Sequence, residues 1–368
     1  MLEVAPPLAE EQLAAVPAKR GVVLLEGEGG TPLLLLTAAD MRARLRNRLS
    51  EDAPAAGGRL ADLRRVTRRI RWRTAGSHFG CDLRFLEFAR LHWPHRWVEW
   101  LAWKPAWFVH VDRDDAAPHF RRTRDVLARP GRYWGPFPDA KVAESFLENL
   151  RDVFGLCRDT AALRQAPHGA RCVYAEMGRC CGVCEGRISM DAYRRLIDEA
   201  GRFITAGRGA RAAELTAQMS AAAAALDFER AADRKKRLQR LEAMDGPAYR
   251  HVAPAEQFRF VLAQPSGSRR AVETFLCHRG WVADGPRLDV PLQPEQLAAA
   301  LERMAERDAA PLPVDAAGRY RMGLVAQALL ASKRRRGLIV RWRPGRTAAE
   351  LRRRIEEAAE ELGIPAPA

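Results

Sequence analysis

The stretch Arg171-Cys-Val-Tyr-Ala-Glu-Met-Gly-Arg-Cys-Cys-Gly-Val-Cys184 contains four cysteines, and a fifth, Cys157, lies upstream of it. The whole chain has seven cysteines in 368 residues, so this grouping is local. Thiolates at short spacing are typical ligands of tetrahedral zinc or of an iron–sulfur cluster, and spacing alone does not choose between the two. The alternative is a set of buried structural thiols without a metal, because free cysteine is often a core residue.

The low cysteine content also bears on the compartment. Seven cysteines are too few for a disulfide scaffold in a chain of this length, so we expect reduced thiols and a cytoplasmic protein. The amino terminus carries acid rather than the basic residues of a signal peptide, and no apolar run reaches membrane-spanning length. We therefore expect a soluble protein without a membrane partner, in which Cys81 and Cys277 are core thiols.

The charge balance favours a polyanionic partner. Lys and Arg outnumber Asp and Glu by 61 to 46, which gives a formal net charge of +15. An arginine-rich, GC-biased proteome is the alternative source of such an excess. Residues 41–73 nevertheless contain eleven arginines against three acids, so the excess is local as well as global.

The pattern of apolar residues predicts both helices and strands, that is, an α+β protein. In the first part of the chain, a hairpin is expected from the apolar runs 22–25 and 33–36, followed by helices over 41–49, capped by Asp40, 60–70 and 82–92. Further on, we expect a tight irregular turn over 131–138, helices over 141–154, 189–206, 210–244 and 318–332, and strands over 258–262 and 271–277.

In this order, the parts of the chain resemble the amino-terminal half of UvrC, the incision subunit of bacterial nucleotide excision repair, and its short homologue Cho. The likeness lies in four segments: residues 17–45, Arg132-Tyr-Trp-Gly-Pro-Phe-Pro138, the cysteine-rich segment and Leu226-Asp-Phe-Glu-Arg-Ala-Ala232. The resemblance implies a small GIY-YIG-like α/β domain (13–110), a Cys-rich metal-binding helical region (111–208), a UVR-like helical hairpin (209–246) and a small C-terminal α+β domain (255–368).

The resemblance also predicts a degenerate nuclease site. A GIY-YIG site uses two tyrosines, an arginine and a metal-binding glutamate. The tyrosine positions are Val23 and Leu34 here, Leu36 replaces a glycine, and Phe85 replaces the glutamate. Only the arginine is kept, as Arg42, so we expect a catalytically silent domain. Glu87 and Asp82 are the nearby acids that offer an alternative metal ligand in place of the missing glutamate. Bound Mg²⁺ is expected only if one of them takes that role.

A basic surface is expected in the same region. Besides Arg42 as a residual catalytic residue, the predicted DNA-binding set comprises Arg42, Arg44, Arg46, Arg48, Arg64, Arg65, Arg68 and Arg69. We interpret these arginines as phosphate contacts without base specificity. Ordinary solvated arginines on basic helices are the alternative.

By the same resemblance, the metal ligands are Cys157, Cys172, Cys180 and Cys184, with an iron–sulfur cluster favoured over zinc. Cys181 is an extra thiol beside them.

The last expectation concerns a partner protein. The resemblance implies that the helical hairpin binds UvrB, with Phe228 as the apolar anchor and Glu229 and Arg230 as its polar rim. The alternative is a helical spacer whose Phe228 caps its own hairpin.

Three functions follow as hypotheses. The leading one is a UvrC/Cho-like DNA repair protein that binds DNA and UvrB with an inactive nuclease site. The second is an active, divergent excision endonuclease that uses Arg42 and unassigned acids. The third is a metal-bearing interaction or redox-sensing protein unrelated to repair.

Overall fold

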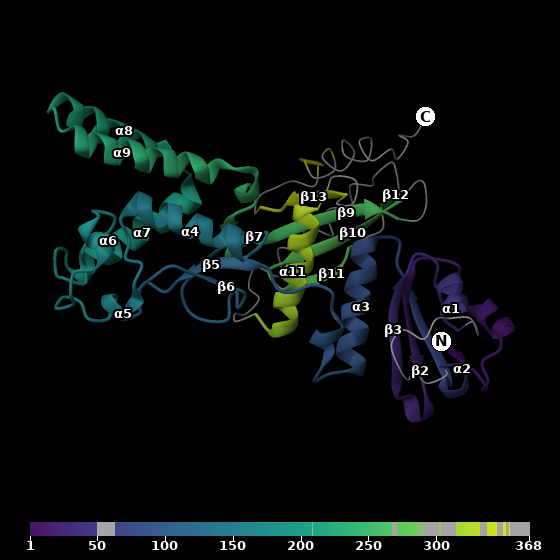
Figure 1. Ribbon diagram of the computed structural model, residues 1–368. Helices are drawn as coiled ribbons and strands as arrows, with labels where there is room; N and C mark the ends of the chain where they lie inside the picture. The colour runs from purple at the N-terminus through teal and green to yellow at the C-terminus, as the bar shows by residue number, and fades with distance from the viewer. Residues whose placement is uncertain are drawn as a thin grey trace. The chain divides into compact units, whose positions relative to one another are not determined.

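The computed structural model describes residues 1–49, 63–207, 209–266, 271–285, 288–289, 302, 314–331, 337–343, 349–350 and 353 (Figure 1). The chain forms two compact units, each assembled from separate stretches of sequence. The first unit contains Met1–Lys104, Phe260–Asp308 and Ala331–Ala368, and the second contains Pro105–Arg259 and Ala309–Leu330. Helices and strands both contribute, as an α+β protein requires.

The first unit begins with an antiparallel sheet in the order β1-β4-β2-β3. Its strands are β1 (Leu2–Glu3), β2 (Gly21–Glu26), β3 (Pro32–Ala38) and β4 (Arg69–Thr74). Strands β2 and β3 are the predicted hairpin. Gly29 and Gly30 in the turn have φ values of 63° and 77°, which side chains rarely adopt.

Helix α1 (Met41–Leu49) agrees with the prediction, and the Asp40 carboxylate accepts a hydrogen bond from the Ala43 amide at 2.9 Å. The predicted basic helix over 60–70 is partly wrong, and its first three residues lie outside the described part. Helix α2 (Leu63–Val66) is short, and Arg69 and Ile70 already belong to β4. Pairing of β4 with β2 outweighs the helix propensity of arginine in this segment.

Helix α3 (His78–His92) starts four residues earlier than expected, because the Ser77 hydroxyl caps it by accepting a hydrogen bond from the Gly80 amide. It packs against β2 and β3 (Figure 1). Its first turn is also attached to a second sheet, since the Glu273 carboxylate accepts hydrogen bonds from Gly76 N and Ser77 Oγ, both at 2.9 Å.

This second sheet has the order β11-β10-β9-β13, and β12 pairs with β10. Its strands are β9 (Arg259–Pro265), β10 (Ala271–His278), β11 (Trp281–Asp284), β12 (Leu288–Asp289) and β13 (Leu338–Arg341). The first two confirm the strands expected over 258–262 and 271–277. Cys81 and Cys277 are buried in this unit, as expected of core thiols.

The second unit contains an antiparallel sheet in the order β6-β5-β7-β8. Its strands are β5 (Trp107–Val111), β6 (Arg121–Thr123), β7 (Arg132–Phe137) and β8 (Ala253–Pro254). Residues 131–138 were expected to form an irregular turn, and this is wrong, because they form β7 between β5 and β8. Tyr133 and Trp134 are buried, and a Cβ at Gly135 would lie 2.6 Å from the Phe108 ring.

Helices complete the second unit. They are α4 (Ala140–Phe154), α5 (Thr160–Leu163), α6 (Val173–Glu176), α7 (Met190–Ala206), α8 (Gly209–Ala224), α9 (Phe228–Glu242) and α11 (Ala316–Leu330). Short 3₁₀ helices also occur in the chain: Glu10–Ala15, Glu28–Gly30, Trp97–Trp100, Ala243–Asp245, Pro247–Tyr249 and Ala255–Gln257. The predicted helix over 210–244 is an antiparallel pair, α8 and α9, which lie side by side (Figure 1). Within the described residues, no helix combines the length and apolar character needed to cross a membrane.

Candidate functional site

The positions expected to carry the nuclease tyrosines are apolar and packed. Val23 is fully buried in β2, where it pairs with Leu36 of β3 and Trp72 of β4. Leu34 and Leu36 are half-buried against the same cluster, which also includes Met41 of α1. None of these side chains has an oxygen that can orient a water molecule.

Arg42 has an internal partner. Its Nε donates a hydrogen bond to the carbonyl oxygen of Val16 at 2.7 Å, which attaches the first turn of α1 to the end of the 3₁₀ helix Glu10–Ala15. Phe85 is half-buried on α3 and offers no ligand atom to a cation.

The two acids that offer an alternative metal ligand lie on the same helix as Phe85. Burial raises the pKa of Asp82 to about 6, and Arg20 opposes that rise. Glu87 forms a long ion pair with Arg73, at 3.6 Å. Across the residues that the structure describes, no three His, Cys, Asp or Glu side chains are arranged to hold a metal ion.

Several predicted DNA-binding arginines hold the amino-terminal segment to the first sheet and its helices. Besides Arg42, Arg46 pairs with Glu10 at 3.2 Å, and Arg64 Nε donates to the Leu8 carbonyl at 3.2 Å. The other arginines differ in exposure and partners. Arg69 pairs with Glu3 and Glu26, Arg68 donates to the Arg65 carbonyl, Arg44 and Arg65 are exposed, and Arg48 is half-buried. Phosphate binding by this set stays a prediction.

Of the clustered cysteines in the second unit, Cys157, Cys180 and Cys184 are buried, and Cys172 and Cys181 are half-buried. Cys157 follows α4, Cys172 precedes α6, and Cys180, Cys181 and Cys184 lie in the segment between α6 and α7. A hydrogen bond with Cys180 and burial raise the pKa of Cys157, and the same two causes raise that of Cys181. Hydrogen bonding with Cys157 and Cys181 lowers the pKa of Cys180. Burial raises the pKa of Cys184.

The influence of Cys180 on the pKa values is thus largest at Cys157 and Cys181, and the charges of Cys172 and Cys180 also raise the pKa of Cys184. The donor chemistry suits zinc or an iron–sulfur cluster. Among the described residues, no group of three or more His, Cys, Asp or Glu side chains is placed to hold a metal ion. The metal and its four ligands stay a prediction.

The tip of the α8–α9 hairpin is exposed. Leu226 has a φ of 57°, the Asp227 carboxylate caps α9 by accepting from the Arg230 amide at 3.0 Å, and Phe228 is 68% exposed. Glu229 and Arg230 are also exposed. Leu215 and Leu241 are buried against the rest of the unit. The expected exposure of Phe228 is confirmed, whereas its binding to a partner stays a prediction.

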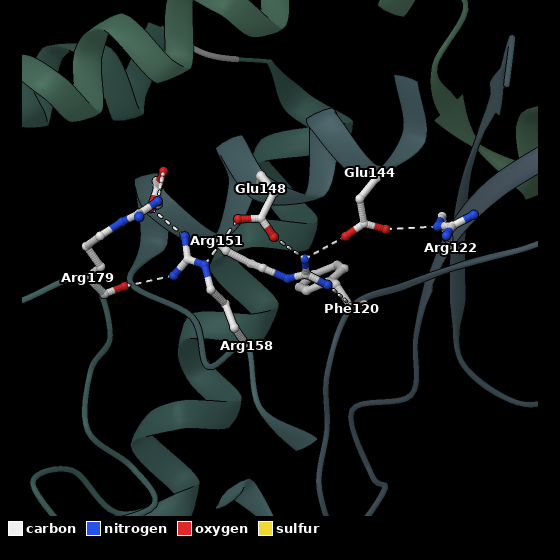
Figure 2. Close-up of polar contacts among 8 residues, drawn as sticks. Phe120, Arg122, Glu144, Glu148, Arg151, Arg158 and Arg179 are labelled. Atoms are coloured by element: carbon white, nitrogen blue, oxygen red, sulfur yellow. Dashed lines mark hydrogen bonds and ion pairs between the residues drawn. The ribbon is translucent and has the colours of Figure 1, made fainter. Parts of the chain in front are cut away.

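Figure 2 shows a chain of ion pairs along α4 that the sequence analysis did not predict. Glu144, Glu148 and Asp152 recur every four residues and so lie on one face of α4. Glu144 pairs with Arg122 of β6 and with Arg151 of α4, both at 2.9 Å. Glu148 pairs with Arg151 at 2.6 Å and with Arg158, which follows α4, at 3.2 Å. Asp152 pairs with Arg158, with Arg179 after α6 at 2.9 Å and with Arg240 of α9 at 3.5 Å. The spacing of the acids is visible in the sequence, but their pairing with arginines from other elements is not.

Asp152 has the largest number of partners in this chain of ion pairs. It contacts Arg158, Arg179 and Arg240, so one carboxylate connects α4, the segment before Cys180 and the α8–α9 hairpin. Arg158 is deeply buried and also donates to the Arg179 carbonyl at 3.1 Å.

Comparison with known proteins bears on residues 106–203, which belong to the second unit. Residues 106–203 match the family model described as "UvrC/Cho excinuclease, middle domain". The chain is a relative of the UvrC/Cho family. The UvrABC system protein C of Moorella thermoacetica is 28% identical over 239 residues, which are 63% of this chain and 37% of that protein. The counterpart from Desulforudis audaxviator is 28% identical over 255 residues, 69% of this chain and 40% of that protein.

A shorter match is closer in sequence. The UvrABC system protein C of Leptospira biflexa is 31% identical over 134 residues, 36% of this chain and 22% of that protein. This UvrC/Cho relative thus spans less than half the length of the curated proteins that it matches. No solved structure matches it. The clustered cysteines and helix α4 fall within the matched residues 106–203, whereas Arg42, Phe228 and Arg240 lie outside them.

Proposed function

We propose that this UvrC/Cho relative acts in nucleotide excision repair by binding DNA and a UvrB-like protein, without cutting DNA through residues 13–110. The relationship of residues 106–203 to the UvrC/Cho middle domain supports the repair role. The observation that carries the absence of cutting is the packing of Val23 and its neighbours, which leaves apolar side chains where the reaction needs oxygens.

Phosphodiester hydrolysis in a GIY-YIG site needs an oriented water, a cation and a positive group at the phosphate. In this chain, Val23 and Leu34 cannot hydrogen-bond a water, and Phe85 cannot bind a cation. Arg42 keeps its charge, but its Nε already donates to Val16. The residues of this region therefore suit a contact with the DNA backbone better than hydrolysis of it.

The partner proposal rests on the hairpin tip. Phe228 exposes a large apolar surface beside the charged Glu229 and Arg230, which is the pattern of an anchor with a polar rim. A second apolar side chain, Leu226, is exposed next to it.

We also propose that Cys157, Cys172, Cys180 and Cys184 hold an iron–sulfur cluster or zinc. The support is the packing of Cys157, Cys172 and Cys180 in one core cluster, the influence of Cys172 and Cys180 on Cys184, and the suitability of sulfur ligands for both metals. When bound, the metal would stabilise the segment between α6 and α7, which has little regular structure of its own.

The second candidate is an active, divergent excision endonuclease. The observation that favours it is the presence of two acids, Asp82 and Glu87, on the same helix as Phe85. Mg²⁺-dependent nicking of damaged duplex DNA separates the two candidates.

Binding measurements test the leading proposal. Fluorescence anisotropy with a lesion-bearing duplex should give saturable binding that weakens with salt, because the contacts are mainly to phosphates. Titration with UvrB should give a complex. Failure to bind either one would contradict the proposal and would favour a metal-bearing interaction or redox-sensing protein.

A further inference from the structure

A hollow with a volume of about 560 Å³ lies between α9, the end of α4 and the segment after α6. The charged residues that line it are Arg179, Lys236, Arg237, Arg240, Asp152 and Asp233. Four cations therefore meet two carboxylates. The hollow is not part of the predicted arginine set or of the exposed hairpin tip.

The two carboxylates are shared with cations outside this set. Asp152 also pairs with Arg158, and Asp233 also pairs with Arg234 at 2.7 Å. Their negative charge is thus divided among more cations than those of the hollow. The wall of the hollow keeps a positive excess, which favours an anionic ligand.

Lys236 is the cation most available to that ligand. Its side chain is exposed, and it makes no ion pair with any residue that the structure describes. Arg240, four residues further along α9, lies on the same face and is 55% exposed, with its Nε 3.5 Å from Asp152.

The spacing of these cations suits a polyanion better than a single small anion. Four residues of helix advance about 6 Å along the axis, at 1.5 Å per residue. One DNA strand carries a phosphate charge for about every 3.4 Å of its axis, so two cations separated by about 6 Å can contact different phosphates of one backbone. Arg179, which follows α6, adds a third cation from another element.

We propose that this hollow binds the phosphate backbone of duplex DNA, with Lys236 and Arg240 as the main contacts and Arg179 and Arg237 as supporting cations. The inference rests on the proposed DNA binding of the chain and assigns part of that binding to the second unit. Contacts of this kind carry no sequence information, so the effect is independent of the base sequence.

The adjacent lysines Lys235 and Lys236 provide a matched test. Both are exposed on α9, but only Lys236 lines the hollow. Lys236→Gln and Lys235→Gln therefore remove the same charge from neighbouring positions. The probe is a short fluorescein-labelled DNA duplex, and its dissociation constant is measured by anisotropy over a range of salt concentrations.

Lys236→Gln should weaken binding and reduce the slope of log K against log salt by about one, the value expected for one lost phosphate contact. Lys235→Gln should leave the slope unchanged. Equal slopes for the two variants would overturn this inference while leaving the DNA-binding proposal standing. Absence of DNA binding by the unmodified chain would overturn both, and circular dichroism confirms that each variant is folded.

Discussion

Asp82 shows how the surroundings of one residue alter its chemistry. Burial on α3 raises its pKa from 3.8 to about 6. The folded protein therefore keeps this proton over a pH range in which the unfolded chain has lost it. The protonated Asp82 carboxyl therefore makes its full contribution to the free energy of unfolding below about pH 4, and this contribution is lost as the pH rises through 6. At pH 7 the ionised carboxylate destabilises the fold.

Asp82→Asn removes that ionisation. We expect the free energy of unfolding to rise by about 2–3 kcal/mol at pH 7, and to change little near pH 4, because a shift of one pKa unit corresponds to about 1.4 kcal/mol. Chemical denaturation at the two pH values measures this difference.

Glu87→Gln is the control on the same helix, since Glu87 forms only a long surface pair with Arg73 and should lose less than about 1 kcal/mol at either pH. Equal stabilisation of Asp82→Asn at both pH values would contradict the assignment.

The cysteine cluster gives a second prediction at this scale. Cys184→Ser should abolish the bound metal, because serine replaces one of four proposed sulfur ligands, whereas Cys181→Ser should retain it. Metal analysis and the visible absorption spectrum of anaerobically purified protein measure the outcome. If Cys181→Ser loses the metal and Cys184→Ser keeps it, Cys181 is the ligand and the proposed set is wrong.

Residue types were read from the sequence more readily than residue partners. The exposure of Phe228 followed from its place between two helices. The hydrogen bond from Arg42 to Val16 could not be foreseen, because it joins residues 26 positions apart through the packing of α1. The ion pairs of Asp152 could not be predicted for the same reason, since Arg179 and Arg240 belong to other parts of the chain.

At the scale of elements, strongly periodic segments were predicted best. Helix α4 and the β2–β3 hairpin have clear apolar patterns, and both are present with small shifts in their ends. The turn predicted over 131–138 is wrong because the two glycines and two prolines of this segment are typical of turns. Strand pairing with β5 and burial of Tyr133 and Trp134 determine that segment instead.

The hairpin of α8 and α9 yields a prediction at this scale. Phe228→Ala should weaken UvrB binding by at least about 2 kcal/mol, roughly thirtyfold, while leaving the melting temperature unchanged, because the ring is largely exposed. Isothermal titration calorimetry measures the affinity.

Leu215→Ala is the contrasting variant, since Leu215 is fully buried and its truncation should cost about 2–5 kcal/mol of stability. Unchanged UvrB affinity in Phe228→Ala would rule out Phe228 as the anchor.

At the scale of the whole molecule, each compact unit is built from stretches that lie far apart in the sequence. The first unit is completed by strands from after residue 259, and the second by α11 from residues 316–330. Sequence patterns report local structure, so they cannot show which distant strand or helix returns to an earlier unit. The match to the UvrC/Cho middle domain covers residues 106–203, within the second unit.

The central claim, a DNA-binding relative of UvrC/Cho without nuclease chemistry in its first unit, is tested most directly by strand incision. An end-labelled, lesion-bearing duplex is incubated with the chain, UvrA, UvrB and Mg²⁺, with EDTA and Arg42→Ala as controls. We predict that the labelled strand stays intact under all conditions. Mg²⁺-dependent nicking that is abolished in Arg42→Ala would contradict the account.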